Sequence, residues 1–277
     1  MIFVTGATGN VGSEVVRALL EGGEQVRALV SSAEAEALLP AGVEGFVGDL
    51  NEPDSLVEAF EGARGVYLLA GYNGTPRFLA HARAAGVEHV VLQSTSLVPF
   101  FDVSNAFAGY HIEAEEAVRE SGLAWTFTQS NSFMSNAYQW LPQLRAGDVV
   151  RVGFADIPEA LIDPVDIAAV TVSAFNSPQH RGRSYHLTGP ESLLPAERLR
   201  VLGDALGRPL QLVALSNDET REQLSKSLPS KLVDAFISIF ADGNHDLSRV
   251  LPAVQDLTGR PPRTFAQWVA AHADAFP

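Results

Sequence analysis

Hydrophobic residues in the first 130 positions alternate between short continuous runs and one-sided stripes. The runs predict buried strands at Ile2–Thr5, Gln25–Val30, Val43–Val47, Gly65–Ala70, His89–Gln93 and Ala124–Thr128. Stripes with helical spacing predict helices at Asn10–Glu21, Ala33–Leu39, Pro53–Phe60, Arg77–Ala85 and Gly109–Ser121. Strands that are apolar throughout are typical of a parallel sheet covered on both faces. Regular strand–helix alternation therefore indicates an α/β fold with a doubly wound parallel sheet.

The regular alternation of strands and helices ends after about residue 130. We expect a loop and helix over Asn131–Leu144, a helix over Asp163–Phe175, and short strands at Val149–Val152, Ser184–Leu187 and Pro209–Leu215. The remaining C-terminal segments are helix-rich. The pattern predicts a dinucleotide-binding domain over residues 1–150 and, mainly within 151–277, a smaller helix-rich substrate-binding lobe. Residues near 160–190 are expected to return to the main sheet.

Composition narrows the class of protein. The formal net charge of the 277-residue chain is −14, which argues against nucleic acid as a partner because such binding needs a basic surface. The chain has no cysteine, and its histidines lack metal-ligand spacing, so we expect no metal site. No apolar run approaches the roughly 18 residues of a membrane span, and the N-terminus does not resemble a signal peptide. We expect a cytoplasmic protein with no membrane partner, either a monomer or a homodimer.

The glycine-rich turn after the first strand is the strongest chemical signal. Gly6, Gly9 and Gly12 fall between that strand and the next helix. A dinucleotide pyrophosphate approaches backbone N–H groups closely only where no side chain intervenes, and the helix behind the turn offers its free amides and dipole to the phosphates. This context predicts a dinucleotide-binding turn.

Several motifs along the chain resemble the NmrA-like group of atypical short-chain dehydrogenases. They are the segments Thr5–Gly12, Gly48–Leu50, Ser121–Thr126, Asn131–Asn136, Asp163–Ala168 and Tyr185–Glu191. The group includes NAD(P)H-dependent quinone, azo and enone reductases, isoflavone-reductase-like enzymes and nucleotide-sensing regulators. The resemblance implies a Rossmann fold.

The resemblance also implies cofactor contacts at defined positions. The pyrophosphate would lie at Gly6, Thr8, Gly9, Asn10 and Val11. Asp49 and Leu50 would lie at the adenine; the alternative role for Asp49 is that of a turn residue or helix cap. Leu69, Ala70 and Gly71 would run beside the ribose and nicotinamide, with Ser94 at the end of the next strand.

The residue at the end of the second strand often decides between NAD and NADP. An acidic side chain there repels a 2′-phosphate, but this chain has Ser31, followed by Ser32. We therefore expect NADPH as the cofactor, with NADH not excluded. The two serines would also be suitable caps for the next helix.

The Tyr-x-x-x-Lys pair of most short-chain dehydrogenases is absent, because Ala114 follows Tyr110 at the lysine position. Alignment with the isoflavone-reductase-like pattern places His111 where those enzymes carry their lysine. Since histidine titrates near neutrality, His111 is the first candidate for general acid or hydrogen-bond donor to the substrate, followed by Tyr110 and Ser94. A surface histidine at a helix start and a serine that only satisfies a strand end are the alternatives.

Substrate-pocket residues are predicted around the ends of strands five and six. They are Ser96, Asn131, Phe133 and Met134. Gln129-Ser130-Asn131 replaces the Arg-Pro pair common in the group after strand six. The chain is thus expected to be an oxidoreductase that transfers hydride from NAD(P)H to a quinone, enone, imine or similar small apolar substrate. The alternatives are an inactive NAD(P)-sensing regulator that binds a protein partner, and a redox-neutral isomerase or cyclase.

Overall fold

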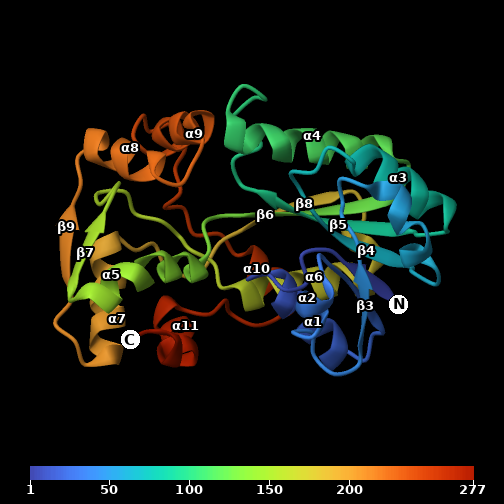
Figure 1. The fold of residues 1–277 in the computed structure, drawn as a ribbon, viewed down its shortest axis with the longest axis horizontal. Coiled ribbons are helices and arrows are strands. Elements are labelled where there is room, and N and C mark those ends of the chain that lie inside the picture. The colour runs from blue at the N-terminus through green and yellow to red at the C-terminus, as the bar shows by residue number, and fades with distance from the viewer.

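A seven-stranded sheet forms the centre of the protein in the computed structural model, which describes residues 1–277 (Figure 1). The strand order is β3-β2-β1-β4-β5-β6-β8, and every neighbouring pair is parallel. The strands are β1 (Ile2–Val4), β2 (Val26–Val30), β3 (Val43–Val47), β4 (Gly65–Leu69), β5 (His89–Thr95), β6 (Ala124–Ser130) and β8 (Arg183–Leu187). The doubly wound Rossmann-like sheet predicted from the alternation is confirmed.

Helices cover both faces of this sheet because side chains on each strand alternate between the faces. Ile2 and Val4 pack in one core with residues of α1 (Gly12–Glu21), α6 (Pro164–Asn176) and α10 (Ala253–Thr258). Phe3 points into the other core, with residues of α3 (Thr75–Ala84) and α4 (Ala106–Glu120). There its ring lies 5.5 Å from that of Phe60. The short α2 (Ala33–Glu36) precedes β3.

A second, smaller unit lies beside the carboxyl ends of the strands, on the left of Figure 1. It contains the parallel pair β7 (Val149–Val152) and β9 (Gln211–Ala214). Its helices are η3 (Met134–Trp140), α5 (Leu141–Ala146), α7 (Pro195–Leu206), α8 (Asn217–Ser225), α9 (Ser230–Phe240) and α11 (Phe265–His272). Most of these elements share a third hydrophobic core that includes Trp140, Val150, Leu202 and Trp268. None of the protein's helices combines the length and apolarity needed to cross a bilayer.

Some predicted element bounds are wrong in ways that matter for the site. The first helix begins at Gly12 rather than Asn10, because residues before Gly12 form the glycine turn. Strands β5 and β6 run on to Thr95 and Ser130, where the two strands still pair with each other. This extension carries polar residues to the sheet edge that adjoins the second unit.

The segment predicted as one helix over Pro53–Phe60 is instead two 3-10 turns, η1 (Pro53–Leu56) and η2 (Glu58–Phe60). Proline begins the first turn, and Glu52 before it provides no side-chain cap. The tighter turns bury Leu56 and Phe60 within a short connection. The predicted helix over Ala33–Leu39 likewise ends early, at Glu36.

Candidate active site

The glycine turn has the geometry of a backbone cradle. Gly6 has a φ of +64°, and a Cβ on Gly12 would lie 2.1 Å from the Gly6 carbonyl oxygen. A side chain at position 12 would therefore push the helix away from the turn. The N–H of Gly9 donates to the Gly6 carbonyl at 3.0 Å, whereas the N–H groups of Thr8, Asn10 and Val11 make no backbone hydrogen bond. Thr8, Gly9 and Asn10 are exposed, so the turn presents amides to a ligand.

The residues predicted at the adenine and ribose end lie in loops after β2 and β3. Ser31 is exposed, whereas the Ser32 hydroxyl accepts a hydrogen bond from the Ala35 N–H at 3.3 Å and caps α2. Asp49 is exposed, and its Oδ1 accepts from the Asn51 N–H at 2.8 Å. Leu50 is buried in the core beneath Asp49. The Ser31 hydroxyl and the second carboxylate oxygen of Asp49 thus make no hydrogen bond within the protein.

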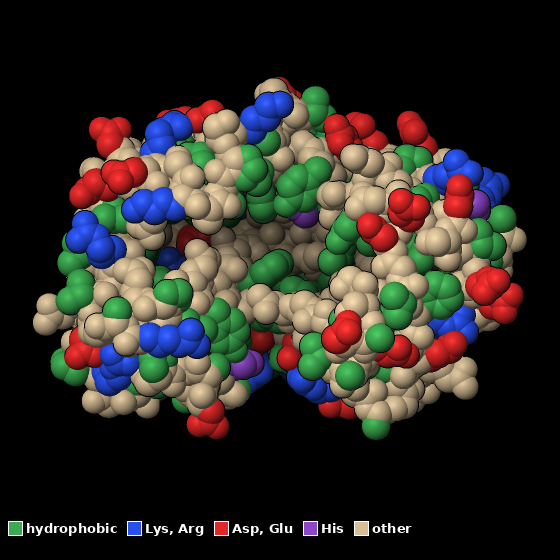
Figure 2. Space-filling model, viewed as in Figure 1, with side chains coloured by type: hydrophobic (Ala, Val, Ile, Leu, Met, Phe, Trp, Pro, Cys, Tyr) green, Lys and Arg blue, Asp and Glu red, His purple; other side chains and the backbone are tan.

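A cavity of about 700 Å³ lies between the carboxyl edge of the sheet and the smaller unit. Figure 2 shows it as a hollow near the middle of the molecule, with hydrophobic side chains around much of its rim. Its size is typical of a small-molecule site. The predicted residues that the cavity brings together are Leu69, Ala70, Ser94, Ser96, His111, Asn131, Phe133 and Met134.

The glycine turn and the cavity adjoin each other through Leu69. A Cβ on Gly6 would lie 2.2 Å from Leu69 Cδ1, and Leu69 itself lines the cavity. Two predicted residues, Gly71 and Tyr110, are not among the lining residues, although they lie together. The Tyr110 ring is 3.5 Å from the position that a Cβ of Gly71 would take. A molecule could thus extend from the turn into the cavity along the ends of β1 and β4.

His111 lies on α4 between aromatic rings. Its ring centroid is 4.3 Å from that of Tyr110 and 5.6 Å from that of Phe107. Burial lowers the pKa of His111 to about 4, and its Nδ1 has no hydrogen-bond partner. The expectation that it titrates near neutrality is therefore wrong, because these rings replace water around the imidazole. Burial also raises the pKa of Tyr110 to about 12. At neutral pH the imidazole is uncharged and the phenol is protonated.

Ser94 is bonded to a buried carboxylate. Its hydroxyl donates to Glu115 Oε1 at 2.6 Å, and Gln129 Nε2 donates to the same oxygen at 2.8 Å. Glu115 is fully buried, and its other oxygen accepts from Arg119 at 2.8 Å. Because the Ser94 proton points to Glu115, the hydroxyl oxygen is left as an acceptor. This differs from the donor to a substrate carbonyl expected from the sequence.

The two other polar candidates differ in what they can offer a ligand. Asn131 Oδ1 accepts from His186 Nε2 at 2.9 Å, and its Nδ2 donates to the Leu247 carbonyl at 3.0 Å. Asn131 is thus occupied in holding the cavity wall together. Ser96 lines the same cavity, and its buried Oγ has no partner. Of the two predicted serines that line the cavity, Ser94 and Ser96, only Ser96 has a hydroxyl that the protein does not use.

Sequence reasoning missed a charged pair in the cavity wall. Arg198 on α7 donates from Nη2 to Glu159 Oε1 at 3.2 Å, and Ser132 donates to Glu159 Oε2 at 2.5 Å. Both Arg198 and Glu159 are buried and line the cavity. They come from segments far apart in the chain, and neither belongs to a local motif. The one signal in the sequence that could have drawn attention to this wall is Arg198 itself, which lies beside Leu199 and Leu202 on what proves to be the buried face of α7.

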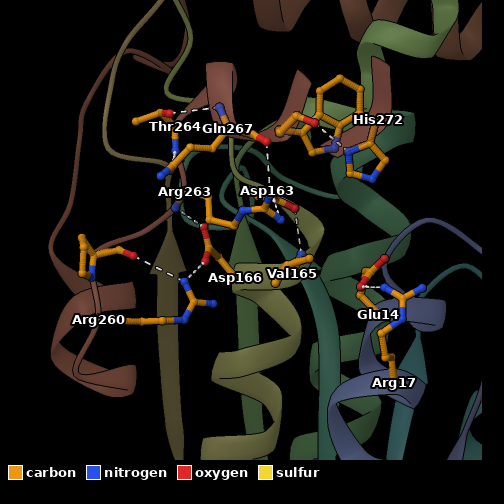
Figure 3. A network of polar contacts seen from close by, with 12 residues as sticks. Glu14, Arg17, Asp163, Val165, Asp166, Arg260, Arg263, Thr264, Gln267 and His272 are labelled. Carbon is orange, nitrogen blue, oxygen red and sulfur yellow. Dashed lines mark hydrogen bonds and ion pairs between the residues drawn. The ribbon is translucent and has the colours of Figure 1, made fainter. Parts of the chain in front are cut away.

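A smaller polar cavity of about 130 Å³ lies beside the glycine turn, lined in part by Asn10, Ser13 and Asp163. Asp163 caps α6 by accepting from the Val165 N–H at 3.0 Å, and its other oxygen pairs with Arg263 at 3.1 Å. Figure 3 shows Asp163 and Arg263 beside the Asp166–Arg260 pair. These contacts fasten the C-terminal segment to the start of α6, next to the turn.

Comparisons with known proteins find relatives along nearly the whole chain. The model of the NmrA-like family matches residues 1–255. The chain is 39% identical to a (4-alkanoyl-5-oxo-2,5-dihydrofuran-3-yl)methyl phosphate reductase of Streptomyces griseus, over 100% of this chain and 99% of that protein. It is 36% identical to a NAD(P)H azoreductase of Xenophilus azovorans, with the same coverage of 100% and 99%.

Among solved structures, an NADPH-dependent quinone oxidoreductase of Escherichia coli has a TM-score of 0.81 at 23% identity, covering 98% of this chain and 99% of that one. A likeness at this identity shows the fold. The family model matches 255 of the 277 residues, and this match shows that the chain belongs to the NmrA-like family.

Proposed function

We propose that the protein is a NAD(P)H-dependent reductase of a small apolar electron acceptor, such as a quinone, enone or imine, with NADPH as its cofactor. The observation that carries this proposal is the glycine turn, whose free amides adjoin, through Leu69, a cavity of about 700 Å³. The relatives named as reductases support the same reaction class.

The turn fits a dinucleotide. Gly6, Gly9 and Gly12 leave a cradle that a Cβ would fill, and the amides of Thr8 and Asn10 are free for a pyrophosphate. In this proposal Ser31 contacts the adenosine ribose or its 2′-phosphate, and Asp49 accepts from the adenine amino group. Leu69, Ala70 and Gly71 then flank the nicotinamide end. When bound, the reduced cofactor supplies a hydride.

The protein's contribution is to orient the acceptor and satisfy its developing charge. Phe133 and Met134 form apolar walls that exclude water. In this proposal His111, neutral at pH 7, donates a hydrogen bond to the oxygen of the electron acceptor, and the Ser96 hydroxyl offers a second hydrogen-bond donor. An uncharged imidazole stabilises an oxyanion as it forms, and the final proton then comes from solvent or through these donors.

An acceptor screen tests the proposal. Purified protein is mixed with NADPH or NADH and a panel of quinones, enones and imines, and loss of the reduced dinucleotide is followed by absorbance. We expect turnover with at least one class, and a decrease of about 10- to 100-fold in kcat/KM for His111→Ala. The matched control is His81→Ala, since His81 lies on α3 and pairs with Asp54 outside the cavity. Absence of consumption across the panel would contradict the proposal.

The screen also separates the remaining alternatives. A regulator would bind NADPH or NADH without turnover, and the missing Tyr-x-x-x-Lys pair is the feature that keeps this alternative open. A redox-neutral isomerase or cyclase would convert its substrate with no net change in the dinucleotide. Both results differ from the stoichiometric oxidation that a reductase gives.

A further inference from the structure

The lining of the cavity contrasts with the acidic protein around it. The formal net charge of the protein is −14, yet the charged side chains that line the cavity are two arginines, Arg151 and Arg198, and one glutamate, Glu159. Each arginine has one carboxylate partner, Glu219 for Arg151 and Glu159 for Arg198, so this wall is close to neutral rather than negative. An anion in the cavity therefore meets arginine side chains, while the surface of the protein repels anions.

Arg198 has hydrogen-bonding capacity that the protein does not use. A guanidinium carries five N–H donors, and the structure gives Arg198 one hydrogen bond, from Nη2 to Glu159. Its Nε is buried without a partner. Burial lowers the pKa of Arg198, which the adjacent Glu159 carboxylate counteracts. A buried cation with unused donors is costly, and an acceptor supplied by a ligand removes that cost.

Glu159 holds Arg198 in place rather than saturating it. One carboxylate oxygen binds Arg198 and the other accepts from Ser132 at 2.5 Å. The backbone of Glu159 is fixed as well, because its N–H donates to the Leu193 carbonyl at 3.1 Å. With both oxygens engaged, Glu159 orients the guanidinium so that its remaining donors are available.

Arg151 on β7 supplies a second, adjustable cation. Gln143 fixes its backbone, with Oε1 accepting from the Arg151 N–H at 2.9 Å. The guanidinium itself has only a loose ion pair, 3.7 Å from Glu219 on α8, and its side chain is 55% exposed. An exposed pair of this kind contributes little to stability, so it is easily exchanged for a ligand.

Another part of the cavity wall is aromatic. The rings of Phe154 and Phe240 stack at 4.9 Å, and Phe236 lies 5.3 Å from Phe107. All four line the cavity. Phe154 is also the only residue other than glycine with a positive φ, at 55°. This surface accommodates an apolar ring or chain.

We propose that the cavity binds amphiphilic acceptors, in which an apolar body lies against these phenylalanines and an anionic head group, a carboxylate or a phosphate ester, binds Arg198 and Arg151. That the bound molecule is a substrate rests on the proposed reductase function; the anion site itself does not.

Calorimetric titration of the full chain without nucleotide tests the anion site. The probes are 1-naphthyl phosphate, 1-naphthaleneacetate and the neutral 1-naphthalenemethanol. We expect both anions to bind at least about ten-fold tighter than the alcohol, because guanidinium–anion hydrogen bonds are charge-assisted. Equal binding of the anions and the alcohol would overturn the proposal.

Variants test whether the two arginines cause the preference for the anions over the alcohol. Arg151→Gln should reduce it several-fold, and the paired change Arg198→Gln with Glu159→Gln, which leaves no unpaired buried charge, should remove most of it. Arg200→Gln is the matched control, because Arg200 lies on the same helix α7 and pairs with Asp204 at the surface. A preference unchanged in Arg151→Gln contradicts the proposal, even if the double variant fails to fold.

The glycine turn is the other place where an anion could bind. Gly9→Asp puts a negative charge at the turn, and the preference for the anions should survive this change. Its loss would assign the binding to the turn and overturn the proposal. Because no NAD(P)H is present, the result is independent of reductase activity: a protein without turnover can still show the preference, and an active reductase can lack it.

Discussion

The buried carboxylate of Glu115 determines how Ser94 can act. Glu115 accepts from Ser94, Gln129 and Arg119, which matches the rule that a buried charge is paired and hydrogen-bonded. Ser94 therefore contributes a hydrogen-bond acceptor to the cavity, and in the proposed reaction the hydrogen-bond donors to the substrate are His111 and Ser96. Gln129, which stands in place of an arginine common in the group, serves this carboxylate.

Replacing Glu115 tests the importance of this network. Glu115→Gln leaves Arg119 without its partner and gives Ser94 a weaker one, so the free energy of unfolding should fall by about 1–3 kcal/mol. Denaturant titration measures it. Glu116→Gln, an exposed neighbour on the same helix, should change it by less than about 0.5 kcal/mol. Equal effects of the two changes would show that the network is not stabilising.

The low pKa of His111 predicts the pH dependence of activity. With its pKa lowered to about 4, the imidazole stays neutral from pH 8 down to about pH 5. The pH profile of kcat/KM should therefore contain no step near pH 6.5 that depends on His111. His111→Gln, which keeps an N–H donor, should retain more activity than His111→Ala. Such a step near 6.5, lost in His111→Ala, would mean that the protonated histidine is the catalytic acid.

Cofactor choice is predicted to depend on Ser31. Its exposed hydroxyl neither repels a 2′-phosphate nor pairs with it strongly. Ser31→Arg should raise the NADPH to NADH ratio of kcat/KM by about ten-fold, and Ser31→Asp should lower it by a similar factor. Nucleotide fluorescence titration gives the same comparison for binding. Ser32 is unsuitable for this test because it caps α2.

At the scale of elements, the start of α1 is fixed by the absence of a side chain at position 12. Gly12→Ala would place a Cβ 2.1 Å from the Gly6 carbonyl oxygen, so NADPH affinity should fall at least ten-fold as the turn is displaced. Gly22→Ala at the other end of α1 meets only ordinary contacts, at 3.4 Å. That control should bind NADPH as the parent does; equal loss in both variants would contradict the role of the turn.

The elements also show what the sequence could predict. Strands β1 to β6 followed from continuous apolar runs, and the glycine turn from three glycines with local spacing, because both signals lie within a few neighbouring residues. The 3-10 turns at Pro53–Phe60 were missed because helical spacing alone does not distinguish them from an α-helix. The Glu159–Arg198 pair was missed because it joins a loop to α7, and only the folded chain brings these segments together.

At the scale of the whole molecule, the candidate site depends on how the smaller unit is held against the sheet. Asp166 accepts from Arg260 at 2.6 Å and from the Arg263 N–H at 2.7 Å, as Figure 3 shows. These contacts fix the C-terminal segment to α6, and α6 in turn packs on α1. Phe265, which follows this segment at the start of α11, lines the cavity, so one part of the cavity wall is anchored next to the glycine turn.

Acid stability is a property of the whole fold. Burial lowers the pKa values of His89, His111 and His186 from 6.5 to about 4. Below pH 6.5 the unfolded chain takes up protons that the folded chain excludes, so stability present above pH 6.5 is lost as the pH falls toward 4. One such histidine contributes at most about 3 kcal/mol to this loss.

Denaturant unfolding at pH 7.5, 6 and 5 measures the loss. We expect the free energy of unfolding to decrease steadily over this range, and His89→Gln to reduce the slope. His81→Gln, at a partly exposed position on α3, is the comparison. A stability independent of pH between 7.5 and 5 would show that these histidines are not held neutral.

The proposed activity is the reduction of an electron acceptor by NADPH, and the stoichiometry of a single turnover measures this reaction itself. Protein, NADPH and an acceptor identified by the screen are mixed without oxygen, and both redox partners are quantified. We expect that one NADPH is oxidised for each acceptor molecule that is reduced by two electrons, and that the Gly9→Asp variant does not carry out the reaction. Bound NADPH that stays reduced, or substrate conversion with no change in the dinucleotide, would contradict the proposed activity.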